Sequence, residues 1–170
     1  MAEAGGLAAT ARRPDLYGMN APRHTPSAHT RIGPGLAAGI DEPMIQALVA
    51  AFYARVRRDP DLGPVFEREV ADWDDHLARL VDFWSSVLLM TGRFKGQPMA
   101  THVRVGGLTP EHFARWLTLF EATAREIWPA KAADLAVAKA RQIGESLQLG
   151  IAASRGELPP HRPRRPQVRG

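Results

Sequence analysis

The chain has 170 residues, of which 45% are hydrophobic, and it carries a net charge of +4. This length fits one domain with a core of its own. The absence of cysteine excludes a disulfide scaffold, a thiolate-bound metal and a cofactor attached through a Cys-x-x-Cys-His motif. A chain without cysteine also suits a reducing compartment, and we expect a cytoplasmic protein.

The charge is spread unevenly along the chain. Residues 1–39 have a net charge of +2, residues 40–152 of −2 and residues 153–170 of +4. The first segment is rich in Ala, Gly, Pro, His and Arg without a helical period, and the last has four prolines within residues 159–166. We therefore predict one globular domain over 40–152 between a disordered N-terminal extension and a disordered basic Pro/Arg tail.

Membranes and nucleic acids are not expected partners. No apolar stretch approaches the roughly 20 residues of a membrane-spanning helix, and no apolar run follows Arg12 and Arg13 as in a secretory signal. The basic tail could attract an anionic surface, and such binding would weaken steeply with salt. Because no aromatic residues alternate with its arginines, base stacking is not expected there.

The first predicted helix begins at Asp41, an N-cap residue, with Pro43 in its first turn, and ends at Asp59-Pro60. The second runs from Trp73 to Thr91, and Gly92 is placed as its C-terminal cap. Both show apolar residues at helical spacing. These residues are Ile45, Leu48, Val49, Phe52 and Val56 in the first helix, and Trp73, Leu77, Leu80, Trp84, Val87 and Leu88 in the second.

A turn-rich stretch over 93–98 and a short piece over 99–105 lead to the third predicted helix. That helix opens with Thr109 as cap and Pro110 in its first position, and Trp128-Pro129 ends it. The fourth covers about 131–152. No segment alternates like a strand, so the predicted class is all-α. The apolar stripes are Phe113, Trp116, Leu117, Phe120 and Ile127, then Ala136, Ala140, Ile143, Leu147 and Ile151.

Common enzyme motifs are absent: the chain has no phosphate loop, dinucleotide fingerprint, His-Glu-x-x-His or nucleophile elbow. The remaining residues whose side chains could bind a ligand or a metal are Tyr53, His76, His102, His112 and Trp116. Taken singly, each is typical of a plain structural role. A core tyrosine bonds a carbonyl, a half-buried histidine is satisfied locally, His112 caps or lies on the surface, and a tryptophan fills the core.

Together, these residues resemble the group III truncated haemoglobins over about 41–151. The similarity lies in several motifs that follow one another in order. They are Phe52-Tyr53-Ala54-Arg55-Val56, Asp61-Leu62-Gly63-Pro64-Val65-Phe66, Trp73-Asp74-Asp75-His76, Phe83-Trp84, Gly96-Gln97-Pro98, His102, and His112-Phe113-Ala114-Arg115-Trp116-Leu117-Thr118-Leu119-Phe120.

The resemblance implies a truncated globin fold, in which two helix pairs sandwich a haem b. It makes His102 the proximal iron ligand, and it makes Tyr53, His76 and Trp116 the residues facing a bound ligand. Arg79, one turn beyond His76, is expected to pair a haem propionate. Further residues expected to line the haem, or the packing behind it, are Phe52, Phe66, Leu80, Phe83 and Trp84.

Phe94 and His112 also bear on the resemblance. Phe94 stands where a tyrosine is frequent in the family, and we expect it to lie outside the pocket. His112 competes with His102 for the iron, but it lies too near the start of the third helix, whereas His102 follows the Gly-Gln-Pro turn.

The implied function is reversible binding of O2, NO or CO, in sensing, scavenging or NO/O2 chemistry rather than bulk transport. NO dioxygenase or peroxidase-like activity would need an external reductase, because the chain has no flavin or nicotinamide motif. The alternative is a haem-free helical module that binds a partner protein. In that case the aromatic residues are only core, and His102 is incidental.

Overall fold

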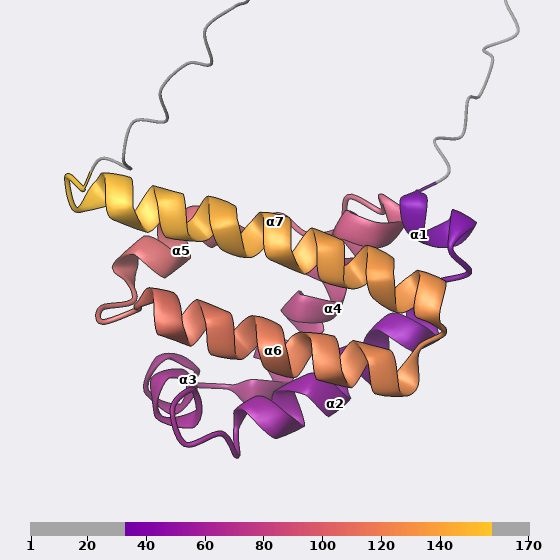
Figure 1. The fold of residues 1–170 in the computed structure, drawn as a ribbon, viewed down its shortest axis with the longest axis horizontal. Helices are drawn as coiled ribbons and strands as arrows, with labels where there is room; N and C mark the ends of the chain where they lie inside the picture. Colours follow the sequence, from indigo (N-terminus) through magenta and orange to yellow (C-terminus); the bar gives the residue numbers. More distant parts are fainter. Residues whose placement is uncertain (1–32, 158–170) are drawn as a thin grey trace, which may run out of the picture. The chain divides into compact units, whose positions relative to one another are not determined.

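A computed structural model describes residues 33–157, and within them every regular element is a helix (Figure 1). The all-α prediction is confirmed. None of the helices in this part of the chain is long and apolar enough to cross a membrane. The helices are α1 (Pro34–Ala37), α2 (Glu42–Val56), α3 (Gly63–Glu69), α4 (Trp73–Leu89), α5 (Pro98–Arg104), α6 (Pro110–Ile127) and α7 (Ala130–Ser154).

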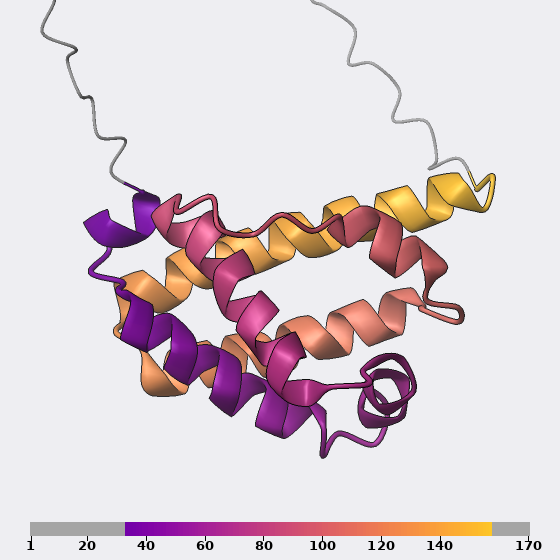
Figure 2. The same ribbon diagram turned by 180° about the vertical axis from the view of Figure 1, so that it is seen from behind.

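The long helices form two pairs. Helices α6 and α7 run antiparallel, joined by the short Trp128-Pro129 connection, and α2 packs against both α4 and α6. Seen from behind, α2 and α4 lie in front of α6 and α7 (Figure 2). The short α5 lies against α7. This is the predicted arrangement of one helix pair over another.

Local sequence explains where most helices begin. The Asp41 carboxylate accepts the Met44 N–H at 2.9 Å, as predicted, and Asp72 accepts the Asp75 N–H at 3.0 Å. Proline occupies the first turn of α2 and of α6. The end of α4 differs from the prediction. The helix stops at Leu89, and Met90 takes the left-handed conformation directly after it (φ 60°), with Gly92 also left-handed two residues later (φ 66°).

Residues 33–39, part of the expected disordered extension, form α1 and a turn. The reason is a close backbone approach to the end of α4: a Cβ on Gly33 or Gly35 would lie 2.7 Å from the backbone of Leu89 or Leu88. Helix α7 likewise continues to Ser154, past the expected boundary at 152. The rest of the two expected tails lies outside the described residues.

The centre of the core is aromatic. The rings of Trp84 and Phe120 stack at 4.9 Å, and those of Phe120 and Trp116 at 5.2 Å. Small residues on α7, such as Ala133, Ala136 and Ala140, are fully buried and let α7 approach this cluster closely. The predicted stripe of α2 is also buried. On α4, however, several stripe residues, including Leu80, remain half-exposed, because this part of the helix faces a cavity.

Candidate functional site

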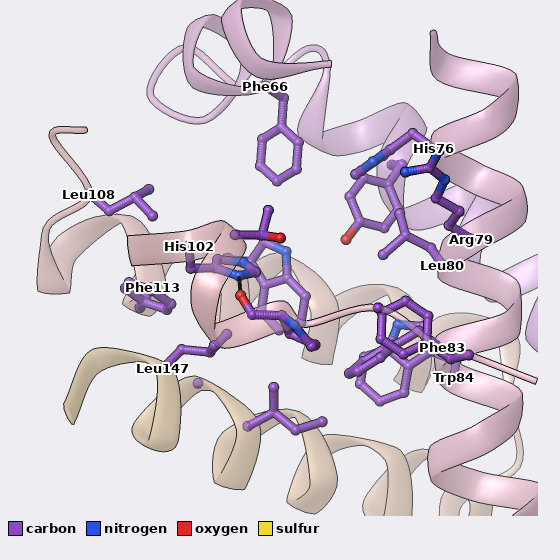
Figure 3. Close-up of a pocket in the computed structure, with 18 of the residues that line it drawn as sticks. Phe66, His76, Arg79, Leu80, Phe83, Trp84, His102, Leu108, Phe113 and Leu147 are labelled. Carbon is purple, nitrogen blue, oxygen red and sulfur yellow. Dashed lines mark hydrogen bonds between the residues drawn. The ribbon is translucent and has the colours of Figure 1, made fainter. Parts of the chain in front are cut away.

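A cavity of about 300 Å³ opens between the two helix pairs (Figure 3). Helices α2 to α7 all contribute to its wall, together with the segments before α5 and before α6. Most of the lining is apolar or aromatic, with a few polar side chains, which is the usual make-up of a small-molecule or cofactor site of this size. Labelled apolar residues around it include Phe66, Leu80, Phe83, Phe113 and Leu147.

The structure brings all but one of the predicted site residues to this cavity. The exception is Phe52, which is 1% exposed and absent from the lining. Its ring packs edge-on behind Tyr53 at 4.8 Å and Trp116 at 5.1 Å, so it positions them from the core. The residues that do line the cavity are Tyr53, Phe66, His76, Arg79, Leu80, His102 and Trp116, with Phe83 and Trp84 beside them.

His102 projects from α5 with its ring orientation set by the backbone. Its Nδ1 lies 2.7 Å from the carbonyl oxygen of Pro98. Because a carbonyl can only accept, Nδ1 carries the proton, and in the neutral ring Nε2 then keeps its lone pair. A neutral imidazole held in this way is the usual form of a metal-ligating histidine. In this tautomer the Nε2 of His102 is a candidate metal ligand.

The position of α5 depends on a close contact with α7. The Met99 side chain packs directly over Gly150, where any Cβ would collide with its sulfur. Two residues after Met99, Thr101 donates its hydroxyl to the Gln97 carbonyl at 3.1 Å. Since α5 has only seven residues, these contacts, rather than helix length, hold His102 in place.

His76 and Tyr53 face each other, with their ring centroids 5.7 Å apart. The His76 Nε2 is buried and has no hydrogen-bond partner within the described part of the chain. Burial lowers the pKa of His76, the positive charge of Arg79 lowers it further, and Asp75 opposes them. The imidazole is therefore neutral near pH 7, and Nε2 is left free for a ligand.

Tyr53 is buried between Phe52, Phe66 and His76. Burial raises the pKa of its hydroxyl far above the usual range, and the nearby Trp116 indole N–H opposes this only partly. Tyr53 therefore stays protonated at any physiological pH. Together with Trp116 it supplies hydrogen-bond donors on the same part of the cavity wall.

Arg79 lies at the rim of the cavity. Its side chain is 72% exposed and pairs with Asp75, one turn earlier on α4, at 2.8 Å. The guanidinium is thus solvated and already has a partner. It can contact a charged group that reaches the cavity mouth but not the interior.

Phe94 was expected outside the pocket, and that prediction is wrong. It lines the cavity, with its ring edge-on to Phe83 at 5.2 Å and pressed over Gly96. The Phe94 N–H donates to the Ser86 hydroxyl at 3.0 Å, which fastens this non-helical stretch to α4. Without a helical period, the sequence carried no signal for which way Phe94 points.

His112 both caps α6 and lines the cavity. Its Nδ1 accepts the Thr109 N–H at 3.2 Å, as the capping interpretation expected, but the ring also forms part of the cavity wall. Leu108 and Phe113 flank it there. Sequence reasoning did not place Leu108 or Phe113 in the cavity wall, and it assigned His112 to a cap or to the surface.

Hydrogen bonds from side chains secure the loop that joins α5 to α6. Arg68 of α3 donates to the Gly106 carbonyl at 3.2 Å, and Arg155 donates to the Leu108 carbonyl at 3.1 Å. In the turn between α2 and α3, the buried Asp59 carboxylate binds Arg115 of α6 at 2.7 Å. These contacts join the short α3, and with it Phe66, to the rest of the cavity wall.

Comparison with known proteins points in one direction. No protein-family model matches the chain. A curated relative, "Group 3 truncated hemoglobin ctb" of Campylobacter jejuni, is 31% identical over 113 residues, which span 64% of this chain and 89% of the relative. The crystal structure of the group III truncated hemoglobin from Campylobacter jejuni superposes with a TM-score of 0.62, at 31% identity and the same shares of the two chains. Sequence and fold therefore agree on the same relative.

Proposed function

The chain belongs to the group III truncated haemoglobins, and on that premise we propose that it holds haem b through His102 and reversibly binds O2, NO or CO. One observation carries the proposal. Two histidines on different helices face one largely apolar cavity, each with its Nε2 free of hydrogen bonds to the described residues. A neutral imidazole on one side and an unfilled polar position on the other suit a metal cofactor between them.

The residues present fit this cofactor. The lining is mostly aromatic and aliphatic, which suits a flat apolar ring, and the buried His76 Nε2 lacks a partner that a ligand would supply. When bound, haem iron would supply the site for a diatomic ligand. His102 would hold the iron, since the Pro98 carbonyl leaves its Nε2 lone pair free.

The chain's own donors decide how long such a ligand stays. Tyr53 is protonated and buried, and Trp116 presents an indole N–H close to it. Donors in a cavity that excludes water form stronger hydrogen bonds than donors in solvent, so they slow the release of a polar ligand such as O2. Slow release suits sensing, scavenging or NO/O2 chemistry better than bulk transport. Turnover as an NO dioxygenase or peroxidase would need electrons from an external reductase.

A haem-free interaction module is the weaker account. It leaves a mostly apolar cavity without an occupant and the His76 Nε2 buried without a partner. An unsatisfied buried polar atom of this kind costs about 1–3 kcal/mol. A ligand bound at this position would supply the hydrogen-bond partner that the buried His76 Nε2 lacks.

The test is an absorption spectrum of the purified full-length chain, reconstituted with haemin and then reduced, with and without CO. We expect one haem per chain and a strong haem band that shifts with CO. In His102→Ala the band should be weakened or altered. In His112→Ala the iron should keep its ligand and the same type of spectrum. No haem uptake by the wild type would reject the proposal, and loss of the ligand in His112→Ala instead would move the iron to His112.

A further inference from the structure

The end of the cavity near α6 has a polar group that iron and ligand binding do not use. His112 lines this end, next to Leu108 and Phe113. Its Nδ1 is engaged with the Thr109 backbone N–H at 3.2 Å and lies 3.1 Å from the Thr109 hydroxyl. The other ring nitrogen, Nε2, has no hydrogen bond to any described residue.

The engagement of Nδ1 determines what Nε2 can do. A backbone N–H can only donate, so Nδ1 of the neutral ring must accept, and the ring proton must sit on Nε2. His112 is therefore the reverse of His102, whose Nδ1 donates and whose Nε2 carries a lone pair. His102 thus offers a lone pair at Nε2, and His112 offers an N–H donor at Nε2.

The character of the lining favours an anionic partner for this donor. No acidic side chain is found among the described residues that line the cavity, whereas Arg79 and three histidines are. Beside His112, the loop before α6 is held by two guanidinium groups, Arg68 on Gly106 and Arg155 on Leu108. Glu111, next to His112 in sequence, is exposed, and Glu69 is paired with Arg68 at 2.8 Å.

Haem b brings two carboxylates, its propionates, into a cavity that is mostly apolar. The expected partner, Arg79, is mostly in solvent and shares its charge with Asp75. Arg79 alone therefore leaves a propionate able to accept a hydrogen bond from a further donor. We propose, resting on the haem-binding function above, that His112 is a second anchor of the cofactor. Its Nε2–H donates to a propionate, and the Thr109 N–H keeps the ring in the tautomer that allows this.

The two roles of His112 can be separated by substitution. In His112→Asn the side-chain oxygen can still accept near the position of Nδ1, but nothing reaches the position of Nε2. In His112→Gln an amide N–H reaches that position. A similar unfolding temperature of the haem-free wild type and His112→Asn would show that the cap of α6 is preserved.

The experiment measures the rate of haem loss from the full-length chain to an excess of a haem-scavenging apoprotein. The wild type and both variants are each loaded with haem b or with haem dimethyl ester, whose propionates are esterified. Because hydrogen bonds to charged groups are the stronger kind, His112→Asn should lose haem b about five- to tenfold faster than the wild type. His112→Gln should stay within about twofold, and with the ester the three proteins should differ by less than about twofold.

The possible results separate this inference from the function on which it rests. Equal haem loss from wild type and His112→Asn would overturn it, as would an acceleration that is the same for the ester, since His112 would then act only through packing or the cap. If the wild type takes up neither haem nor the ester, the haem-binding proposal itself fails, and the role of His112 fails with it.

Discussion

Replacing Tyr53 with phenylalanine isolates one hydroxyl group. The ring packs edge-on against Phe52 at 4.8 Å and against Phe66 at 5.7 Å, and phenylalanine keeps these contacts. The hydroxyl is buried and protonated, so its loss removes a buried donor from a mostly apolar cavity. A hydrogen bond there should contribute about 1–2 kcal/mol to holding O2, toward the upper end for neutral pairs.

That free energy translates into a rate. Since 1.4 kcal/mol corresponds to a factor of ten, Tyr53→Phe should release O2 about 5 to 30 times faster than the wild type. The assay is stopped-flow displacement of O2 by excess CO from the reduced protein. CO is a poorer hydrogen-bond acceptor, so CO release from the same variant serves as the control and should change much less.

Two results would refute this reasoning. An unchanged O2 dissociation rate in Tyr53→Phe would remove Tyr53 from the ligand site. Equal acceleration for O2 and CO would mean that the substitution widened the cavity instead of removing a hydrogen bond.

The pKa of Tyr53 is raised and that of His76 lowered, so neither group changes charge from pH 7 to pH 9. The wild-type rate should be flat over that range.

Three further predictions concern the supports of the site. Asp59→Ala should lower the free energy of unfolding by about 2 kcal/mol in urea titrations, because the buried carboxylate binds Arg115 and the N–H groups of Asp61 and Leu62. Burial raises the pKa of Asp59, but these hydrogen bonds outweigh it and leave the pKa below 3.8. The difference in unfolding free energy between the wild type and Asp59→Ala should thus be constant above about pH 5 and shrink as pH falls through the lowered pKa of Asp59. A free-energy difference that stays constant down to about pH 2 would contradict this. Phe52→Ala should cost about 3–5 kcal/mol by the same assay, and a cost under about 1 kcal/mol would show that Phe52 does not support Tyr53 and Trp116. Gly150→Leu should displace Met99 and α5, speed haem loss and cost about 1–3 kcal/mol in the apoprotein, whereas Leu149→Ala, at an exposed neighbouring position, should change neither.

The sequence predicts the long helices well, because each has an apolar stripe and most have a capping residue. The starts of α2 and α6 follow from Asp41, Thr109 and their prolines. The short elements escape such reasoning. Helix α3 has seven residues and α1 has four, too few for a period, and their positions depend on contacts with distant segments, such as Gly35 against α4.

The site was predictable only in part. Helical spacing places Tyr53, His76 and Trp116 on the apolar sides of three helices, but nothing in the spacing says that the three sides enclose one cavity; the family resemblance supplied that. Phe94 and Leu108 lie in non-helical segments whose direction is set by single contacts, with Ser86 and Arg155. His112 shows the opposite difficulty, since a correct structural explanation, the cap, hid a second position in the cavity wall.

The walls of the cavity differ in how firmly they are closed. Packed helices form most of them, but the gap between α3 and the loop before α6 is bridged by Arg68 on the Gly106 carbonyl, and its side chain is 58% exposed. An exposed hydrogen bond of this kind contributes on the order of 1 kcal/mol or less, far below the free energy of unfolding a domain. Separating α3 from this loop should therefore cost less free energy than separating the two packed helix pairs. We therefore expect this wall to open locally while the two helix pairs stay folded.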